Sequence, residues 1–355
     1  MVDAWIAGDC WLKPGIAPID LRFISAGLSP SLLVVNLECA VPSGNPRSDR
    51  RSLLPLDPCR LRELAVANKT VCVMANNHVT DFGPESVLAT LRAVTEGGLL
   101  ALGAGATLEE ARKPVVLDIA GRHIGLLAYA DTRPHVGAMA ASDRDPGVAP
   151  LDSKIVLEDV RRLARSVDDL WLFLHWGREY FRYPEPEQRT LAQAFAEAGA
   201  DLIVGIHPHV VQGSERFGDT PVYYSLGNFV FPPIPLADHS LLRWDGESRQ
   251  GTALQGTLGV DGWCWAHIPC CMSAIGGPLA VSGHDREARM QKLTRLSRVL
   301  DKDYARRYPR FRKQERFMSA MRRLRMMSWS ERLRLPGRLI RRGAADLRGQ
   351  TTIRQ

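Results

Sequence analysis

Five apolar segments of this chain end in the same way, with a polar residue that can bind a metal or move a proton. The segments are residues 4–7, 32–35, 71–75, 170–174 and 201–204. Continuously apolar runs of this length are typical of parallel strands in a sheet that is covered on both faces. Open α/β sheets bind ligands beyond the carboxyl ends of such strands. We therefore predict that the polar residues after the five runs meet at one site; they are Asp9, Glu38, Asn77, His175, His207 and His209.

The last of these motifs, His207-Pro208-His209, places two imidazoles in one short loop. Two histidines separated by one residue can face the same point if the chain bends between them, and Pro208 favours that bend. Two imidazoles from one loop suit a transition-metal site. Taken alone, the motif fits two surface histidines equally well, and the other four motifs favour the metal site.

The residue types in the set indicate which metals would bind. Imidazoles combined with carboxylates and an amide oxygen fit Mn, Fe or Zn, and fit neither an all-oxygen Ca²⁺ site nor a thiolate Zn²⁺ site. Six donors are too many for one catalytic ion that must keep open positions. Two divalent transition-metal ions about 3.5–4 Å apart, sharing a carboxylate, would use them all and would lower the pKa of a bridging water.

Two further residues in the third motif suit proton transfer. His78 follows the proposed ligand Asn77 and could protonate a leaving group or stabilise an oxyanion. Asp81 comes three residues later and could orient the other ring nitrogen of His78. We predict His78 and Asp81 as the catalytic residues.

The order and spacing of these motifs resemble those of the CapA-type poly-γ-glutamate capsule-synthesis proteins, a branch of the calcineurin-like metallophosphoesterase superfamily. The resemblance covers roughly residues 1–235, and more loosely to about 285. The matching segments are residues 8–9, 36–38, 75–83, 175–180, 207–212 and 223–231. The resemblance implies an α/β fold, a four-layer α/β/β/α sandwich with metals at the strand ends. It also implies that the six residues above are metal ligands and that His78 meets the leaving oxygen of the substrate.

Three positions depart from the pattern of that superfamily. Trp11 stands where calcineurin-like enzymes carry a His, which predicts weaker binding of one ion. Glu38 stands in place of the usual Asp and would be the bridging carboxylate. Ile206 stands where relatives commonly have another His, which removes a contact with the substrate. Glu179 and Asn228 are the candidate substrate-binding residues. Alternatively, Glu179 accepts a hydrogen bond from a metal-bound His, and Asn228 caps the loop of residues 207–209.

The rest of the chain alternates between helix and strand signals. We expect helices at 84–97, 153–166 and 187–198, strands at 114–119 and 122–129, and a hairpin over 251–268. The loops 42–58 and 131–150 are long enough to be lids. Arg47, Arg50 and Arg51 in the first loop are candidates to bind an anionic substrate, although solvated loop charges explain them equally well. We predict a metallophosphoesterase-like domain over 1–288 and an Arg-rich helical extension over 289–355.

Charge is distributed unevenly between these two parts. Residues 290–355 contain 20 basic and 5 acidic residues, a net charge of +15, whereas the rest of the chain has a net charge of −8. Basic residues interleaved with Trp, Met and Leu suit an interfacial helix on anionic lipid, and equally an anionic polymer or an acidic partner. Packing of a helical extension on the body explains the composition as well. Nucleic acid is disfavoured because no nucleic-acid-binding motif accompanies the charge.

Cysteine usage and the first residues bear on the compartment. The seven cysteines form no C-x-x-C pattern, and their odd number favours a reducing environment. The first fifteen residues contain no apolar core of a signal peptide, and no run reaches 18 apolar residues. We therefore expect a cytoplasmic protein, with peripheral contact at the inner face of the membrane through the extension.

Three functions are compatible with these observations. The first is a hydrolase acting on a phosphoester or an acyl or amide bond in the synthesis of an anionic polymer. The second is a non-hydrolytic metal-binding component of a capsule-synthesis machine, and the third is a tailoring enzyme for a secondary metabolite. The His78 and Asp81 pair favours catalysis, because metal binding alone needs no general acid.

Overall fold

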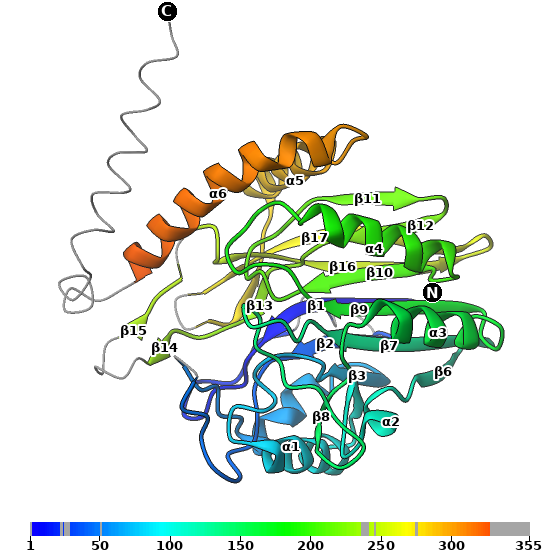
Figure 1. Cartoon of the computed structure of the whole chain (residues 1–355), viewed down its shortest axis with the longest axis vertical. Coiled ribbons are helices and arrows are strands. Elements are labelled where there is room, and N and C mark those ends of the chain that lie inside the picture. Colours follow the sequence, from blue (N-terminus) through cyan, green and yellow to red (C-terminus); the bar gives the residue numbers. More distant parts are fainter. Residues whose placement is uncertain are drawn as a thin grey trace, which may run out of the picture.

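The computed structural model describes residues 2–21, 24, 29–49, 52–235, 241–244, 246–273 and 276–326 (Figure 1). It is built around two large β-sheets. The first has, in spatial order, β18 (Pro278–Ala280), β17 (Gly262–Met272), β16 (Gln250–Gly259), β1 (Asp3–Cys10), β2 (Leu32–Leu37), β3 (Lys69–Val73) and β4 (Leu100–Leu102), with β13 (Asn228–Val230) also paired to β1. The second has β11 (Ser214–Phe217), β12 (Thr220–Tyr223), β10 (Leu202–Ile206), β9 (Asp169–His175), β7 (Arg122–Ala130) and β6 (Val115–Ile119). Two short pairs are β5 (Ala104–Gly105) with β8 (Gly147–Val148), and β14 (Ile234–Pro235) with β15 (Leu241–Leu242).

The three helices predicted at 84–97, 153–166 and 187–198 begin and end within three residues of those bounds, whereas two short helices, at 58–64 and 108–111, were not predicted. The helices are η1 (Pro58–Leu64), α1 (Pro84–Glu96), α2 (Leu108–Ala111), α3 (Ser153–Leu163), α4 (Pro186–Glu197), α5 (Gly283–Arg298) and α6 (Tyr304–Met326). Asp152 caps α3, because its side chain accepts a hydrogen bond from the backbone N–H of Lys154 at 2.8 Å. Gln188 closes the start of α4 by accepting from the backbone N–H of Glu185 at 2.7 Å.

The two sheets pack face to face between layers of helices, as strand β9 illustrates. Trp171 and Phe173 share a core with the eight-stranded sheet, whereas Leu172 points to the other face and shares a core with α3 and α4. The Trp171 ring meets the rings of Trp263 and Trp265 on β17 edge-on, at centroid distances of 5.2 and 4.9 Å. Helices α3 and α4 cover the six-stranded sheet (Figure 1), and α1 and η1 join the core of the other sheet. The predicted α/β/β/α sandwich is confirmed.

The parallel strands bring the predicted site residues to one edge. Strands β1, β2 and β3 run parallel in the first sheet, as do β7, β9 and β10 in the second. Asp9 lies opposite both Asn36 on β2 and Asn228 on β13. His175 lies opposite Ile206, the last residue of β10. The carboxyl ends of the parallel strands in both sheets therefore meet where the site is expected.

The described part of the C-terminal extension packs on the body. Leu293, Leu296 and Leu300 are buried, and so are Tyr304 and Tyr308 at the start of α6. Packing of the extension, one of the alternatives above, therefore holds as far as Glu315, and residues 327–355 lie outside the described part. The predicted domain boundary after residue 288 falls within α5, and the division into two domains stays a prediction. Among the described residues, no helix is both long enough and apolar enough to cross a bilayer.

Candidate metal centre

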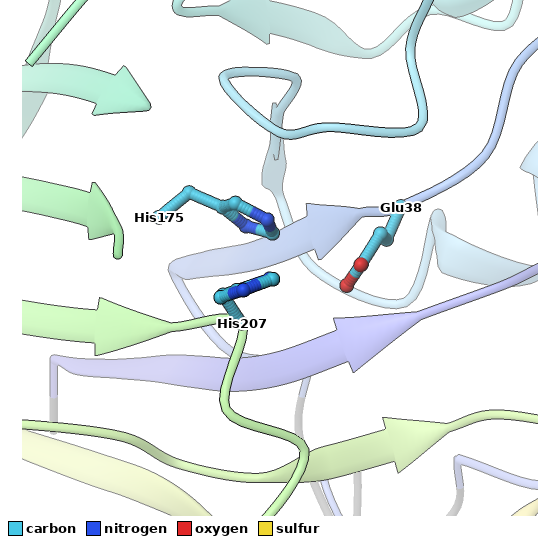
Figure 2. A group of neighbouring side chains, drawn as sticks. All are labelled: Glu38, His175 and His207. Carbon is cyan, nitrogen blue, oxygen red and sulfur yellow. The ribbon is translucent and has the colours of Figure 1, made fainter. Parts of the chain in front are cut away.

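Two groups of buried donors lie at the carboxyl ends of the strands and share Glu38. In the first group, ligand atoms of Glu38, His175 and His207 lie within 4.8 Å of one another. Figure 2 shows these three side chains pointing toward one another. In the second group, ligand atoms of Asp9, Glu38 and His209 lie within 4.8 Å of one another. A carboxylate common to two donor groups is the arrangement that a dinuclear centre uses.

Asn77 adds the remaining predicted donor. Its Oδ1 lies 3.1 Å from Nε2 of His175, a member of the first group. The structure thus brings all six predicted ligands to one place. That they bind metal stays a prediction.

Unpaired polar atoms within the buried donor set support the binding of a transition metal. His207 is fully buried, and neither of its ring nitrogens has a hydrogen-bond partner among the described residues. Oε1 of the buried Glu38 likewise accepts no hydrogen bond from them. An unsatisfied buried polar group costs about 1–3 kcal/mol. A divalent cation between these residues would satisfy both, and the mix of imidazole and carboxylate suits Mn, Fe or Zn.

Asn36 holds the two carboxylates in place. Its Nδ2 donates to Oδ1 of Asp9 at 2.9 Å and to Oε2 of Glu38 at 3.1 Å. Asn76 in turn donates from Nδ2 to the Leu37 carbonyl at 2.9 Å and to Oδ1 of Asn36 at 3.3 Å. Sequence reasoning gave neither asparagine a role, although both lie in the strand-end motifs. Such supporting hydrogen bonds orient ligands and tune their affinity for metal.

His209 is oriented by two neighbours on its Nδ1 side. That atom lies 2.9 Å from Oδ1 of Asn228 and 3.2 Å from Oδ2 of Asp9. Asn228 is itself fixed, because its Nδ2 donates to the Ser248 carbonyl at 2.9 Å. This geometry leaves Nε2 of His209 facing Oε1 of Glu38 at 3.7 Å. Asn228 thus supports the loop of residues 207–209, and its contact with a substrate stays a prediction.

Both histidines of this loop have a positive φ angle, a backbone conformation that residues other than glycine rarely adopt. The φ angle is 98° at His207 and 54° at His209, and it is 65° at the neighbouring Tyr180. Each such residue costs roughly 1–3 kcal/mol and persists only where the surroundings hold it. Two contacts do so: the Tyr180 N–H donates to the Pro208 carbonyl at 2.7 Å, and the His207 N–H donates to Oδ1 of Asp9 at 3.3 Å. None of this was visible in the sequence.

Two glycines permit the backbones that carry the ligands to approach each other. A Cβ atom on Gly8, next to Asp9, would lie 2.0 Å from the Gly227 carbonyl oxygen. A Cβ atom on Gly205, two residues before His207, would lie 2.0 Å from the Tyr224 carbonyl oxygen. Any side chain at either position would push the strand ends apart.

The electrostatics of the buried cluster favour cation binding. Burial and the negative charge of Asp9 raise the pKa of Glu38 well above its usual value. Burial raises the pKa of Asp9, but hydrogen bonds and charge from His209 outweigh burial and keep that pKa below its ordinary value. Burial lowers the pKa of His207 to about 3, so its imidazole is neutral and can bind a metal. Burial also lowers the pKa of His209, but the charges of Glu38 and Asp9 outweigh this and raise it to about 10. A metal bound beside His209 would therefore displace its proton.

His78 and Asp81 form a pair at the edge of the donor groups. Nδ1 of His78 lies 2.7 Å from Oδ2 of Asp81, which also accepts from the Leu54 N–H at 2.8 Å. Nε2 of His78 lies 3.9 Å from Oε1 of Glu38. The His78 side chain is 11% exposed, whereas the side chain of Glu38 is fully buried. His78 therefore lies between the predicted metal ligands and the solvent, where a proton donor to a substrate would be.

Comparison with known proteins identifies the family. The family described as "Bacterial capsule synthesis protein PGA_cap" matches residues 22–233, more than half of the chain. The chain belongs to this family. It is 36% identical over 186 residues to the PGA biosynthesis protein CapA of Bacillus subtilis, covering 52% of this chain and 48% of that protein. It is 32% identical over 189 residues to the capsule biosynthesis protein CapA of Bacillus anthracis, covering 52% and 46%. The chain thus spans about half the length of these curated relatives.

Solved structures include distant relatives of the fold. The calcineurin-like phosphoesterase YfkN of Bacillus subtilis is 12% identical with a TM-score of 0.41, covering 83% of this chain and 96% of that one. A putative 5′-nucleotidase from Staphylococcus aureus is 12% identical with a TM-score of 0.45, covering 83% of this chain and 58% of that one. These likenesses say nothing about what this PGA_cap protein acts on.

Glu179 and Arg47, two other predicted substrate contacts of this PGA_cap protein, have different surroundings. Glu179 is half-buried, and its charge contributes to the raised pKa values of Glu38 and His209, which places it near both. Arg47 is engaged with its own loop, pairing with Asp49 at 2.6 Å and donating to Oγ1 of Thr80 at 3.1 Å. Arg50 and Arg51, the other candidates for anion binding, lie outside the described residues.

One strand-end residue escaped sequence reasoning. Asp131 directly follows β7, the strand beside β9, and its N–H donates to the His175 carbonyl at 2.9 Å. It binds the Arg133 guanidinium at 2.7 Å and lies 3.9 Å from Nε2 of His135. The signal was present, because Asp131 follows an apolar strand as the other site residues do. The Pro-, Gly- and Ser-rich composition of residues 131–150 instead indicates that it belongs to a long loop.

Proposed function

We propose that this PGA_cap protein is a metal-dependent hydrolase with two metal sites to which Glu38 would be common, and that it acts on a phosphoester or an acyl or amide bond. The observation that carries the proposal is the pair of donor groups with one common carboxylate beside the His78–Asp81 pair. A purely structural metal site is closed and needs no general acid. Two curated relatives are named for the biosynthesis of PGA and of capsule. We infer from this that the bond lies in an anionic polymer such as poly-γ-glutamate, or in a precursor of it.

The chain's own residues supply positioning and proton transfer. When bound, two divalent ions would lower the pKa of a water and polarise the scissile group. Asn36 keeps the carboxylates of Asp9 and Glu38 aimed at the centre. His78 presents Nε2 toward the substrate side and delivers a proton to the leaving oxygen, while Asp81 holds its Nδ1.

The first prediction concerns metal content and thermal stability. We expect the reconstituted protein to retain about two ions of Mn, Fe or Zn per chain, because the six donors form two groups. An ion present at a thousand times its Kd stabilises a protein by about 4 kcal/mol. Chelation should therefore lower Tm by about 5–10 °C in a chain of this size. Elemental analysis and thermal unfolding with and without chelator measure both quantities.

Turnover is measured on the same preparation with a nitrophenyl phosphodiester, a nitrophenyl phosphomonoester and a γ-glutamyl nitroanilide. Metal-dependent release of nitrophenol or nitroaniline supports the hydrolase. Two bound ions without turnover of any of the three would favour the non-hydrolytic metal-binding component. A protein that binds none of the three metals after reconstitution contradicts the proposal.

The second prediction concerns the basic end of the chain. We propose that residues 327–355 contact an anionic partner, either a membrane leaflet or the polymer itself. Each basic residue near an anionic leaflet contributes about 1 kcal/mol. The full chain should co-sediment with anionic vesicles at low salt and dissociate as salt rises, because exposed charges are screened. Replacing Arg332, Arg334 and Arg338 by Gln should weaken that binding and leave metal content unchanged. If the full chain binds neither anionic vesicles nor polyglutamate at low salt, the proposed contact with an anionic partner is wrong.

A further inference from the structure

The segment between β9 and α4, residues 176–185, is attached to the loop that carries two of the metal-ligand histidines. The Trp176 N–H donates to the Ile206 carbonyl at 3.2 Å, and the Tyr180 N–H donates to the Pro208 carbonyl at 2.7 Å. Nε2 of the buried Gln212 donates to the Phe181 carbonyl at 2.7 Å. These three hydrogen bonds involve the first, a middle and the last residue of the 206–212 loop. The 176–185 segment therefore packs along that loop and holds its backbone in place.

The other side of the 176–185 segment is held by α6, the last described helix. Glu315 on α6 is fully buried, and its Oε2 accepts from the Arg182 backbone N–H at 2.8 Å. Its Oε1 accepts from Nε of the same arginine at 2.8 Å. The Tyr304 hydroxyl donates to the Pro184 carbonyl, and the Tyr183 ring stacks on Phe311 at a centroid distance of 4.6 Å. The C-terminal extension thus binds the 176–185 segment through hydrogen bonds to its backbone, an ion pair and stacked rings. Figure 1 shows α6 at the edge of the molecule opposite α1.

We propose that the Arg182–Glu315 pair is a latch through which the C-terminal extension positions the metal-ligand loop. The inference rests on the proposed metal centre and adds α6 to its support. Arg182 and Glu315 are positioning residues, because they reach the centre only through the 176–185 segment. Glu315 is fully buried and the Arg182 side chain is 26% exposed, so the pair is partly shielded from water. Its charge-assisted hydrogen bonds, together with the one from the Arg182 backbone, hold the segment in place.

The latch should affect the two donor groups unequally. In the first group, His175 ends strand β9 and Glu38 follows strand β2. His207 directly follows β10, whose last residue pairs with His175, so strand pairing holds all three residues of that group more closely than it holds His209. His209 lies beyond Pro208 in a strained conformation, and its ring centroid lies 6.2 Å from that of Tyr180 on the latched segment. If the segment shifts, the loop can relax its positive φ angles and His209 moves first. The ion of the Asp9–Glu38–His209 group should therefore be bound more weakly, while the other ion stays.

The test compares Glu315→Ala and Glu315→Gln in the full chain with wild type. Mn²⁺ or Zn²⁺ binding is followed by equilibrium dialysis, and hydrogen exchange is followed in peptides covering residues 176–185 and 206–212. In Glu315→Ala we expect faster exchange in both peptides and about 10–100-fold weaker binding of one ion, the usual effect of losing an outer support of a ligand. Glu315→Gln should be intermediate, because its amide oxygen still accepts from the Arg182 N–H.

A matched control breaks an Arg–Asp pair at the other end of the same strand. Asp169 begins β9 and pairs with Arg122 at 2.8 Å, far along the strand from His175. Asp169→Asn should retain both ions with unchanged affinity and leave exchange in residues 206–212 unchanged. If Glu315→Ala does not fold, Tyr304→Phe, which removes only the hydrogen bond to Pro184, and Glu315→Gln carry the test.

The outcomes separate the latch from the metal centre. Unchanged exchange in the 176–185 peptide of Glu315→Ala overturns the latch, whatever the metal content. Faster exchange with both ions still bound as in wild type overturns its role in positioning the ligands and leaves the hydrolase proposal standing. A wild-type protein that binds no metal overturns the proposed function and, with it, the positioning role. Equal loss of both ions overturns the unequal support of the two groups.

Discussion

Glu38→Gln should release both metal ions at once and reduce hydrolysis by about 10³-fold or more. Glu38 is the residue common to the two donor groups, so its carboxylate would contact both ions. A bound metal contributes several kcal/mol of charge stabilisation in the transition state, and each 1.36 kcal/mol is worth a factor of ten. Gln keeps the length of the side chain and an oxygen that can accept from Asn36. Loss of metal would thus follow from loss of charge and not from a change of shape.

Variants of residues that belong to one group only provide the comparison. Asp9→Asn should weaken only the ion of the second group, and His175→Ala only the ion of the first. Elemental analysis should give about one ion in each of these two variants and less than one in Glu38→Gln. If Glu38→Gln retains one ion as tightly as wild type, Glu38 does not bridge and the dinuclear arrangement is wrong.

Stability without metal distinguishes this effect from misfolding. Burial and Asp9 raise the pKa of Glu38 in the folded protein. A carboxyl group with a raised folded pKa contributes stability below its unfolded pKa, and that stability is lost as pH rises through the folded value. At neutral pH, metal-free Glu38→Gln should therefore unfold at a higher temperature than metal-free wild type, while the order reverses when metal is added.

The strand-end pattern allowed all six donors to be found from the sequence, because parallel pairing fixes where strand ends lie. Each apolar run pairs with its neighbour in a register that brings the next polar residue to the same edge, as Asp9 does opposite Asn36. The helix boundaries were predictable for a similar local reason, since Asp152 and Pro186 mark the starts of α3 and α4. These features depend on neighbouring residues, and the sequence displays them directly.

The parts of the site that could not be predicted depend on contacts between distant segments. The hydrogen bonds from Asn36 to two carboxylates require the final positions of both side chains. The sequence gives no sign of the positive φ angles at His207 and His209, because glycine, the residue that usually marks such angles, is at neither position. Arg182 and Glu315 are 133 residues apart, so their pairing could not be read from charge patterning. The composition of the extension fits both membrane contact and packing on the body, and its described part packs on the body.

His78→Asn should leave both ions bound and lower kcat by about 10²–10⁴-fold, the usual contribution of a positioned general acid. Asn can still bind Asp81, but it offers no imidazole proton to a leaving oxygen. The defect should be larger for an alkyl phosphoester than for a nitrophenyl phosphoester, because a good leaving group departs without being protonated. Single-turnover rates on the two esters, with metal content measured in parallel, test the assignment.

The dependence on leaving group separates proton donation from a structural role. Asp81→Asn should show a smaller defect with the same dependence, because it keeps the His78 imidazole and disturbs its orientation. His123→Asn, which changes an exposed histidine near the start of β7, should leave both rates unchanged. A defect of equal size on both esters, or loss of metal from His78→Asn, would show that His78 supports the centre and gives up no proton. The leaving oxygen would then have to be protonated by solvent or by another group.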